Sequence, residues 1–385
     1  MSDFIAWRFL IFAIVFAGLL YLQFYLARRQ WKKIKGAPAS EIDVGYVRME
    51  DYMAQSFRRK VKEWLKLPPT SVTEEGRTIL KGRETIRVTT GADFDAGEHC
   101  NDILVIDGDF NCGANCVFSR EILVKGNARI GPGTQLQSIA VEGNLTLESG
   151  VRVARWVDSA RALTIGAECL IGARVTSQGT IRLGPDAQAE SFYSPQVATP
   201  GWDGTFAPNF AREVAKLPEI VFTEDMNSSE ERLYEAGFDV KKLIQLAPDC
   251  WLYKGDFRNS TPFRLKSKLV VKGKGEFPEG CILEADVRAD GSLSIGANSV
   301  CRASLTSGRD ISLGPGCRFA GVLHADGSVH LGRGTRGFKD DGLVVAFAGE
   351  SLRVERDVAI KGKLAAGGRV IVESAEAAEA KQQGA

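Results

Sequence analysis

Apolar and polar positions repeat about every 18 residues along two long stretches of the chain. Each repeat is a six-residue phrase: usually a glycine, then a spacer, an apolar residue, a polar residue, a second apolar residue and, in most copies, another glycine. This spacing is typical of a β-solenoid, in which each repeat forms one coil that stacks on the next. The copies are 108–113, 126–131, 143–148, 161–166 and 179–184, followed by 291–296, 309–314, 327–332, 350–355 and 368–373.

Apolar residues two apart predict short strands with one buried face, because successive side chains of a strand point to opposite sides. Stacked coils would bring the same position of each copy into a vertical apolar column. A β-sandwich also has short alternating strands, but it does not require a constant repeat length. The expected core column consists of Ile130, Leu147, Ile165, Leu183, Ile295, Leu313 and Leu331.

A glycine that follows a polar residue stands just before most of these strands. We interpret these positions as corners at which the backbone needs a positive φ angle. The expected turn glycines are Gly108, Gly126, Gly143, Gly179, Gly291, Gly308 and Gly327.

The repeated region is itself duplicated. A shift of 183 residues lays Asp107-Gly108 on Asp290-Gly291 and Gly131-Pro132-Gly133 on Gly314-Pro315-Gly316. We therefore expect two β-solenoid blocks, 80–198 and 252–376, in a mostly β protein. The period is lost in 199–251, where 210–216 and a capping box of Ser228 with Glu231 predict a helical connector. Residues 377–385 are expected to be disordered.

The first 35 residues resemble a membrane anchor. Phe9–Ala27 contains 19 residues without a charge, which is long enough to span a bilayer. A cleaved signal peptide would have a shorter apolar region, preceded by its positive charge. The basic residues that follow favour an N-terminus outside, with the solenoid blocks in the cytoplasm beside the bacterial inner membrane. This basic membrane flank consists of Arg28, Arg29, Lys32, Lys33 and Lys35.

Residues 36–79 are expected to form a juxtamembrane segment. An amphipathic helix over 47–67 carries apolar residues on one stripe and basic residues opposite. The stripe has two possible partners, an anionic lipid surface or the open first coil of the solenoid. Pro68-Pro69 ends the helix in either case.

Composition and cysteine spacing limit the partners, metal sites and cofactors that the sequence predicts. The net charge is +1, which gives no reason to expect nucleic acid as a partner. Of the eight cysteines, Cys112 and Cys116 are the only close pair, without a CxxC spacing or a second pair for zinc. Cys112 takes a core-column position, so we interpret it as a small apolar residue in a reducing compartment. No cofactor, metal site or catalytic residue is predicted, and the glycine-rich stretches lack the features of a phosphate-binding loop.

Three histidines support the strongest enzymatic alternative. A period of 18 equals three hexapeptides, and hexapeptide-repeat acyltransferases use a histidine as general base. Ile165-Gly166 and Ile171-Gly172 fit that pattern, but Ser177 occupies the next slot. His330, between Val329 and Leu331, is expected to point outward on a strand.

Runs such as 291–298 and 311–321, with polar-Gly corners and Ile/Leu-Gly endings, resemble the bactofilins, a family of bacterial cytoskeletal proteins. The resemblance implies a right-handed β-helix that joins end to end into filaments without nucleotide, beside the membrane, as a scaffold for envelope or polarity proteins. The coil ends alone predict either a cap or self-association, because their strand edges are otherwise unpaired. We therefore expect a membrane-anchored, non-enzymatic scaffold whose partners are the lipid bilayer and itself. The alternatives are an acyltransferase and a monomeric platform that binds an envelope protein or polysaccharide.

Overall fold

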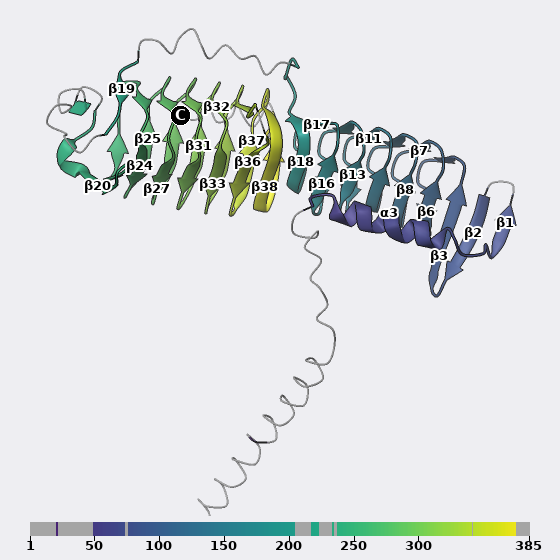
Figure 1. Cartoon of the computed structure of the whole chain (residues 1–385). Coiled ribbons are helices and arrows are strands. Elements are labelled where there is room, and N and C mark those ends of the chain that lie inside the picture. The colour runs from purple at the N-terminus through teal and green to yellow at the C-terminus, as the bar shows by residue number, and fades with distance from the viewer. Residues whose placement is uncertain are drawn as a thin grey trace, which may run out of the picture. The chain divides into compact units, whose positions relative to one another are not determined.

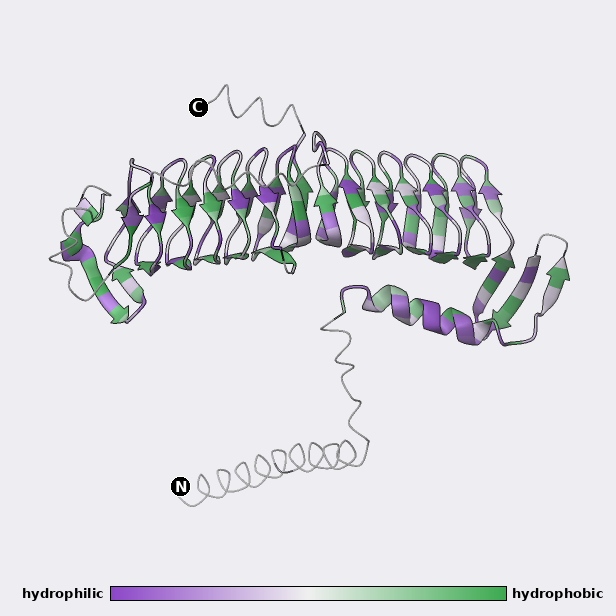
Figure 2. Ribbon diagram, turned by 45° about the horizontal axis from the view of Figure 1, so that its top comes forward, coloured by the Kyte–Doolittle hydropathy of each residue, from purple (hydrophilic) through white to green (hydrophobic). Residues whose placement is uncertain are grey.

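The computed structural model describes Tyr21 and residues 49–73, 76–204, 217–222, 233–234, 237–340 and 342–374. The chain divides into two units, Met1–Tyr52 and Met53–Ala385. The second unit contains one continuous β-solenoid of about 15 turns. Figure 1 shows its coils, in which each strand pairs in parallel with the matching strand of the next coil. Hydrophobic and hydrophilic residues alternate along many of these strands (Figure 2).

Each coil contributes to three faces, here called A, B and C in chain order. In the first half of the solenoid, β8 (Val117–Val124) and β10 (Gln135–Val141) continue around the corner from face B to face C. Face A contains β4 (Ala92–Phe94), β7 (Phe110–Cys112), β9 (Ala128–Ile130), β11 (Leu145–Leu147), β14 (Leu163–Ile165) and β17 (Thr180–Leu183). Face B adds β5 (His99–Cys100), β12 (Arg152–Val153) and β15 (Leu170–Ile171). Face C adds β3 (Glu84–Thr89), β6 (Ile103–Ile106), β13 (Val157–Ser159) and β16 (Arg174–Ser177).

The second half of the solenoid repeats these faces. Its face A contains β22 (Phe257–Arg258), β25 (Gly275–Phe277), β28 (Leu293–Ile295), β31 (Ile311–Leu313), β34 (Val329–Leu331) and β37 (Ser351–Val354). Its face B contains β23 (Arg264–Leu265), β26 (Ile282–Leu283), β29 (Val300–Cys301), β32 (Arg318–Phe319) and β35 (Arg336–Gly337). Its face C contains β21 (Cys250–Tyr253), β24 (Lys268–Val271), β27 (Val287–Ala289), β30 (Leu305–Ser307), β33 (Val322–Ala325) and β36 (Val344–Ala348).

The last coils of the two halves pair with each other, which corrects the prediction of two separate blocks. β18 (Gln188–Ala198) and β38 (Ala359–Val372) each run around all three faces. They pair antiparallel, with Phe192 opposite Leu364 and Val197 opposite Ile360. The two C-terminal ends, which would otherwise expose unpaired strand edges, therefore join into one hydrogen-bonded sheet. The direction of the chain along the solenoid reverses at this junction.

The expected helices are corrected as well. Except for Tyr21, Phe9–Ala27 and its basic flank lie outside the described residues, and within the described part no helix is long and apolar enough to cross a bilayer. The prediction of a single-pass protein of the bacterial inner membrane is wrong on this finding. The one complete α-helix among the described residues, α3 (Tyr52–Trp64), has 13 residues, about 20 Å of helix.

The connector 199–251 is described only in part. The helix predicted over 210–216 lies outside the described residues, and of the helix predicted after Ser228 only Leu233 and Tyr234 are described as helical. The described remainder contributes β19 (Glu219–Ile220), a short 3-10 helix (Val240–Lys242) and β20 (Leu243–Ala247). Leu233 and Phe238, two apolar residues of the expected helical stripe, are buried in the core. Their apolar side chains are explained by this packing at one end of the solenoid.

α3 packs its apolar side along face C of the first half. Phe57, Val61 and Trp64 are buried against outward side chains that include Val105, Leu123 and Trp156. At the far end of this contact, Arg58 forms a 2.6 Å ion pair with Asp158 of β13, whose side chain is only 6% exposed. The stripe thus covers the side of the solenoid, whereas the sequence suggested lipid or the first coil as its partner.

The predicted turn glycines are required for a different reason than their φ angle. None of Gly108, Gly126, Gly143, Gly179, Gly291, Gly308 and Gly327 has a positive φ. A Cβ atom at each would lie under 3.0 Å from an atom of the preceding coil, such as the carbonyl oxygen of Thr90 below Gly108. Stacking of the coils leaves no room for a side chain at this corner.

Positive φ angles occur at another corner, about once per coil. The corner after face A holds residues in the left-handed region, and several of them are not glycine: Asn115, Glu168, Asp186, Asn298 and Asp357. Asn and Asp adopt this conformation more readily than most residues. The tight turn of each coil is therefore encoded by a mixture of residue types, which obscured it in the sequence.

Replacement of Gly108 by alanine tests the stacking constraint. We expect Gly108→Ala to lower the free energy of unfolding by about 1–3 kcal/mol, because the new methyl group meets the Thr90 carbonyl. Gly91→Ala is the matched control, since a Cβ there would come no closer than 3.8 Å to the nearest atom, the Asp109 carbonyl oxygen. This variant should change stability by less than about 1 kcal/mol. Urea denaturation measures both, and equal effects would contradict the explanation.

Candidate functional site

The predicted core-column residues lie inside the solenoid at matching positions of successive coils. Leu147 is the register partner of both Ile130 and Ile165, and Ile165 is the partner of Leu183. In the second half, Leu313 is the partner of both Ile295 and Leu331. All seven side chains are buried. They are part of the packed core, so they contribute stability and no exposed chemistry.

Small polar side chains also point into the core, where they bond to the backbone. Ser307 donates to the carbonyl oxygen of Gly291 at 2.7 Å, and Ser159 donates to that of Gly143 at 2.9 Å. Ser177, which interrupts the hexapeptide pattern, is likewise buried and donates to Arg161. These hydroxyls satisfy carbonyl groups at the corners of the coils.

The cysteines are free thiols, and all except the half-buried Cys250 are buried. Cys116, Cys169 and Cys317 place Sγ within 3.0–3.1 Å of a carbonyl oxygen of the preceding coil. Burial raises the pKa of the Cys112, Cys281 and Cys317 thiols to about 11. These groups are therefore neutral at physiological pH and poorly nucleophilic.

The raised thiol pKa values predict a loss of stability at alkaline pH. An unfolded thiol releases its proton near pH 9.0, whereas these three release it near 11 in the folded chain. Between these values the unfolded state binds fewer protons, so stability falls with rising pH, by about 1.4 kcal/mol per pH unit for each thiol. Cys112→Val should make the slope from denaturation curves shallower by about one proton. An unchanged slope would contradict the assignment.

The two outer ends of the solenoid differ in how they are closed. At the first coil, β4 pairs only with β7 and β5 pairs only with β8 among the described strands. Ala92 and Phe94 are only partly buried there. This surface, formed by Ala92–Phe94 and His99–Cys100, is the open end. Face C alone continues beyond it, through β2 (Gly76–Lys81) and β1 (Ser71–Thr73), which add antiparallel.

The opposite end is capped. β19 pairs with β23 on face B, and β20 pairs with β21 on face C. The interior is closed by an aromatic cluster in which the Phe238 ring lies 4.7 Å from Phe257 and 5.2 Å from Phe263, between centroids. Phe222 packs on Phe238 at 5.3 Å. The connector thus supplies the residues that close the second half.

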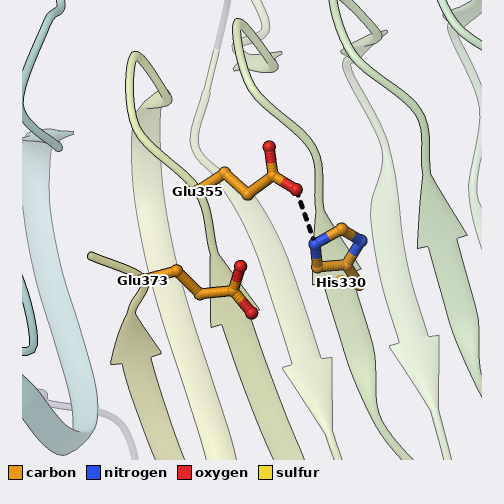
Figure 3. A group of neighbouring side chains, drawn as sticks. All are labelled: His330, Glu355 and Glu373. Carbon is orange, nitrogen blue, oxygen red and sulfur yellow. Dashed lines mark ion pairs between the residues drawn. The ribbon is translucent and has the colours of Figure 1, made fainter. Parts of the chain in front are cut away.

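A group of titratable side chains lies near the junction, on three successive coils. His330 comes from β34, Glu355 follows β37 and Glu373 follows β38 (Figure 3). The Nε2 atom of His330 is 3.0 Å from Oε1 of Glu355, and one donor atom of each residue lies within 4.8 Å of the others. Arg353 is 3.8 Å from Glu373. Imidazole and carboxylate groups in this arrangement can supply three ligands to a metal ion.

Sequence reasoning missed this group, although the repeat contained a signal for it. Glu355 and Glu373 occupy the closing slot of the phrase, where Gly296, Gly314 and Gly332 stand in earlier coils. Two carboxylates in the same slot of adjacent coils must lie about one strand spacing apart. His330 was treated alone, as an outward residue of its strand.

The other histidines are placed separately. His99 is exposed on β5, and His324 stacks on the ring of Phe347 at 5.3 Å. Neither lies in the group of His330. The basic flank Arg28–Lys35 lies outside the described residues.

Comparison with known proteins adds no relative: no family model, no curated protein and no solved structure matches this chain. Its function is therefore argued from the repeat fold, the unequal ends and the side chains described above.

Proposed function

We propose that this chain is a non-enzymatic scaffold of the bactofilin type, and that two copies associate through the open end. The repeated phrase supports the resemblance, and a β-solenoid is suited to a scaffold role because it presents long, regular faces. The observation that carries the proposal is the pair of edge strands β4 and β5, whose outer edges have no partner among the described strands.

The backbone of β4 is oriented for edge pairing. Ala92 N–H donates to Asp109, and the carbonyl oxygen of Phe94 accepts from Gly113 at 2.8 Å. Because alternate residues of a parallel strand direct their backbone groups to opposite sides, Asp93 directs its N–H and C=O outward. Exposed edge groups of this kind recruit another strand.

The capped opposite end limits how far association proceeds. Head-to-tail growth needs two unlike open ends, whereas at the opposite end β19 and β20 cover faces B and C and Phe238 plugs the interior, so that only β22 of face A has no outer partner among the described strands. Contact between two like ends is isologous and closes as a dimer. We therefore expect a closed dimer, with the long faces left available to other envelope or polarity proteins.

Light scattering of the full chain tests this proposal. We expect a mass of twice 41.8 kDa that falls to 41.8 kDa in Asp93→Pro, because proline removes an outward N–H. Asp93→Ala is the matched control, since it removes the charge but keeps the N–H, and it should stay dimeric. Both variants should keep the wild-type unfolding temperature within a few degrees.

Two results would contradict the proposal. One is a wild-type chain that stays monomeric at about 100 µM. The other is an Asp93→Pro variant that folds and associates as strongly as wild type. Long filaments in electron micrographs would contradict the closed dimer specifically.

A further inference from the structure

We propose that His330, Glu355 and Glu373 bind a divalent transition-metal ion, with Zn²⁺ as the best fit, and that this ion fastens the last strand of the solenoid to the two coils before it. This inference is independent of the proposed dimer. The three residues lie beside the junction, whereas the open end belongs to the first coil.

The ligand geometry follows from the stacking of coils. Val354 and Val372 are register partners, so Glu355 and Glu373 leave adjacent strands at the same slot. Leu331 is the partner of Val354, which brings the coil of His330 next to them. Strands about 4.8 Å apart place the three side chains close enough for small rotations to bring their donor atoms around one ion.

The charges at the site favour a cation. Two carboxylates lie together, and the Glu373 side chain is only 6% exposed. Arg353, 3.8 Å from Glu373, balances one of these charges. The remaining negative charge would attract a divalent ion in a place where water screens it poorly.

The imidazole of His330 supplies a second, independent indication of a metal site. The Nε2 atom of His330 is buried and makes no hydrogen bond among the described residues, although Glu355 is 3.0 Å away. A buried ring nitrogen without a hydrogen bond is well placed to give its lone pair to a metal. A nitrogen ligand favours Zn²⁺ over Mg²⁺ or Ca²⁺, which prefer oxygen ligands only.

The partial exposure of two of these side chains would allow an ion and a water molecule to reach the site. The side chains of His330 and Glu355 are 33% and 23% exposed, so one side of the site faces solvent. Three protein ligands and one water molecule would complete the four positions that Zn²⁺ prefers.

Binding would be linked to the junction between the two halves. Glu373 follows Val372, whose carbonyl oxygen accepts from Asp186 N–H at 2.9 Å and whose N–H donates to Ala187 at 3.1 Å. An ion that holds Glu373 therefore holds the end of β38 where it bonds to the first half. A ligand that binds only the folded state also raises its stability.

The experiment uses the full chain, freed of metal by a chelator and then titrated with Zn²⁺ against a chromophoric chelator. We expect one tight site per chain and a rise in unfolding temperature on saturation. Glu373→Gln and His330→Gln should each weaken this site by at least about tenfold and abolish the thermal shift. Glu148→Gln is the matched control, because Glu148 occupies the same slot in the first half but pairs with Arg129, and it should bind as wild type does.

The His330→Gln variant keeps the test valid if Glu373→Gln is unstable, because His330 is less buried than Glu373. Cobalt(II) gives a second readout, since a tetrahedral site yields a visible absorption band that both variants should lose. Zn²⁺ binding that is the same in wild type and both variants would overturn the proposal, as would the absence of binding at about 100 µM Zn²⁺. Ca²⁺ binding as tight as Zn²⁺ and unaffected by His330→Gln would overturn the imidazole ligand.

Discussion

Backbone hydrogen bonding between matching positions of successive coils sets every other feature of this solenoid. Each strand bonds to the strand one repeat before it and one repeat after it, as Ser294 does with Glu276 and Ser312. This spacing of about 4.8 Å stacks the apolar columns. It also leaves no space above a carbonyl group at the corners, where glycine is needed. The 18-residue period in the sequence is a consequence of this single constraint.

The same constraint explains why the two halves join. A stacked coil always leaves one unpaired edge at each end, and here β18 and β38 satisfy each other by antiparallel pairing. Arg369 adds a bond across the junction to the carbonyl oxygen of Ile171 at 3.1 Å. The arrangement uses both C-terminal edges within one chain and leaves the two N-terminal ends outermost. Because the connector closes one of these, the ends of a duplicated protein have become unequal.

The two halves differ in their outward-facing residues, although their inward-facing residues are alike. On face C of the first half the outward partners include Val105, Leu123 and Ala140, and α3 covers them. The corresponding partners in the second half are Arg288, Thr306 and His324. No described helix covers that face. The closing slot diverges too, since Glu355 and Glu373 replace glycine in two adjacent coils, whereas in the first half Glu148 pairs with Arg129. Function in such a fold depends on these outward substitutions, because the inward columns are fixed by packing.

The sequence by itself determined the coil. A fixed repeat of alternating residues such as Leu293-Ser294-Ile295 specifies strand, buried face and register, because all three follow from local spacing. Continuous apolar runs such as Ile103–Ile106 also indicate strands buried on both sides, a signal that local alternation alone does not use. The tertiary structure decided how the halves meet, which end is plugged by Phe238, and that His330 lies beside Glu355 and Glu373. Those outcomes depend on contacts between residues far apart in the chain. A repeat pattern contains no information about which unpaired strand edges will pair with each other.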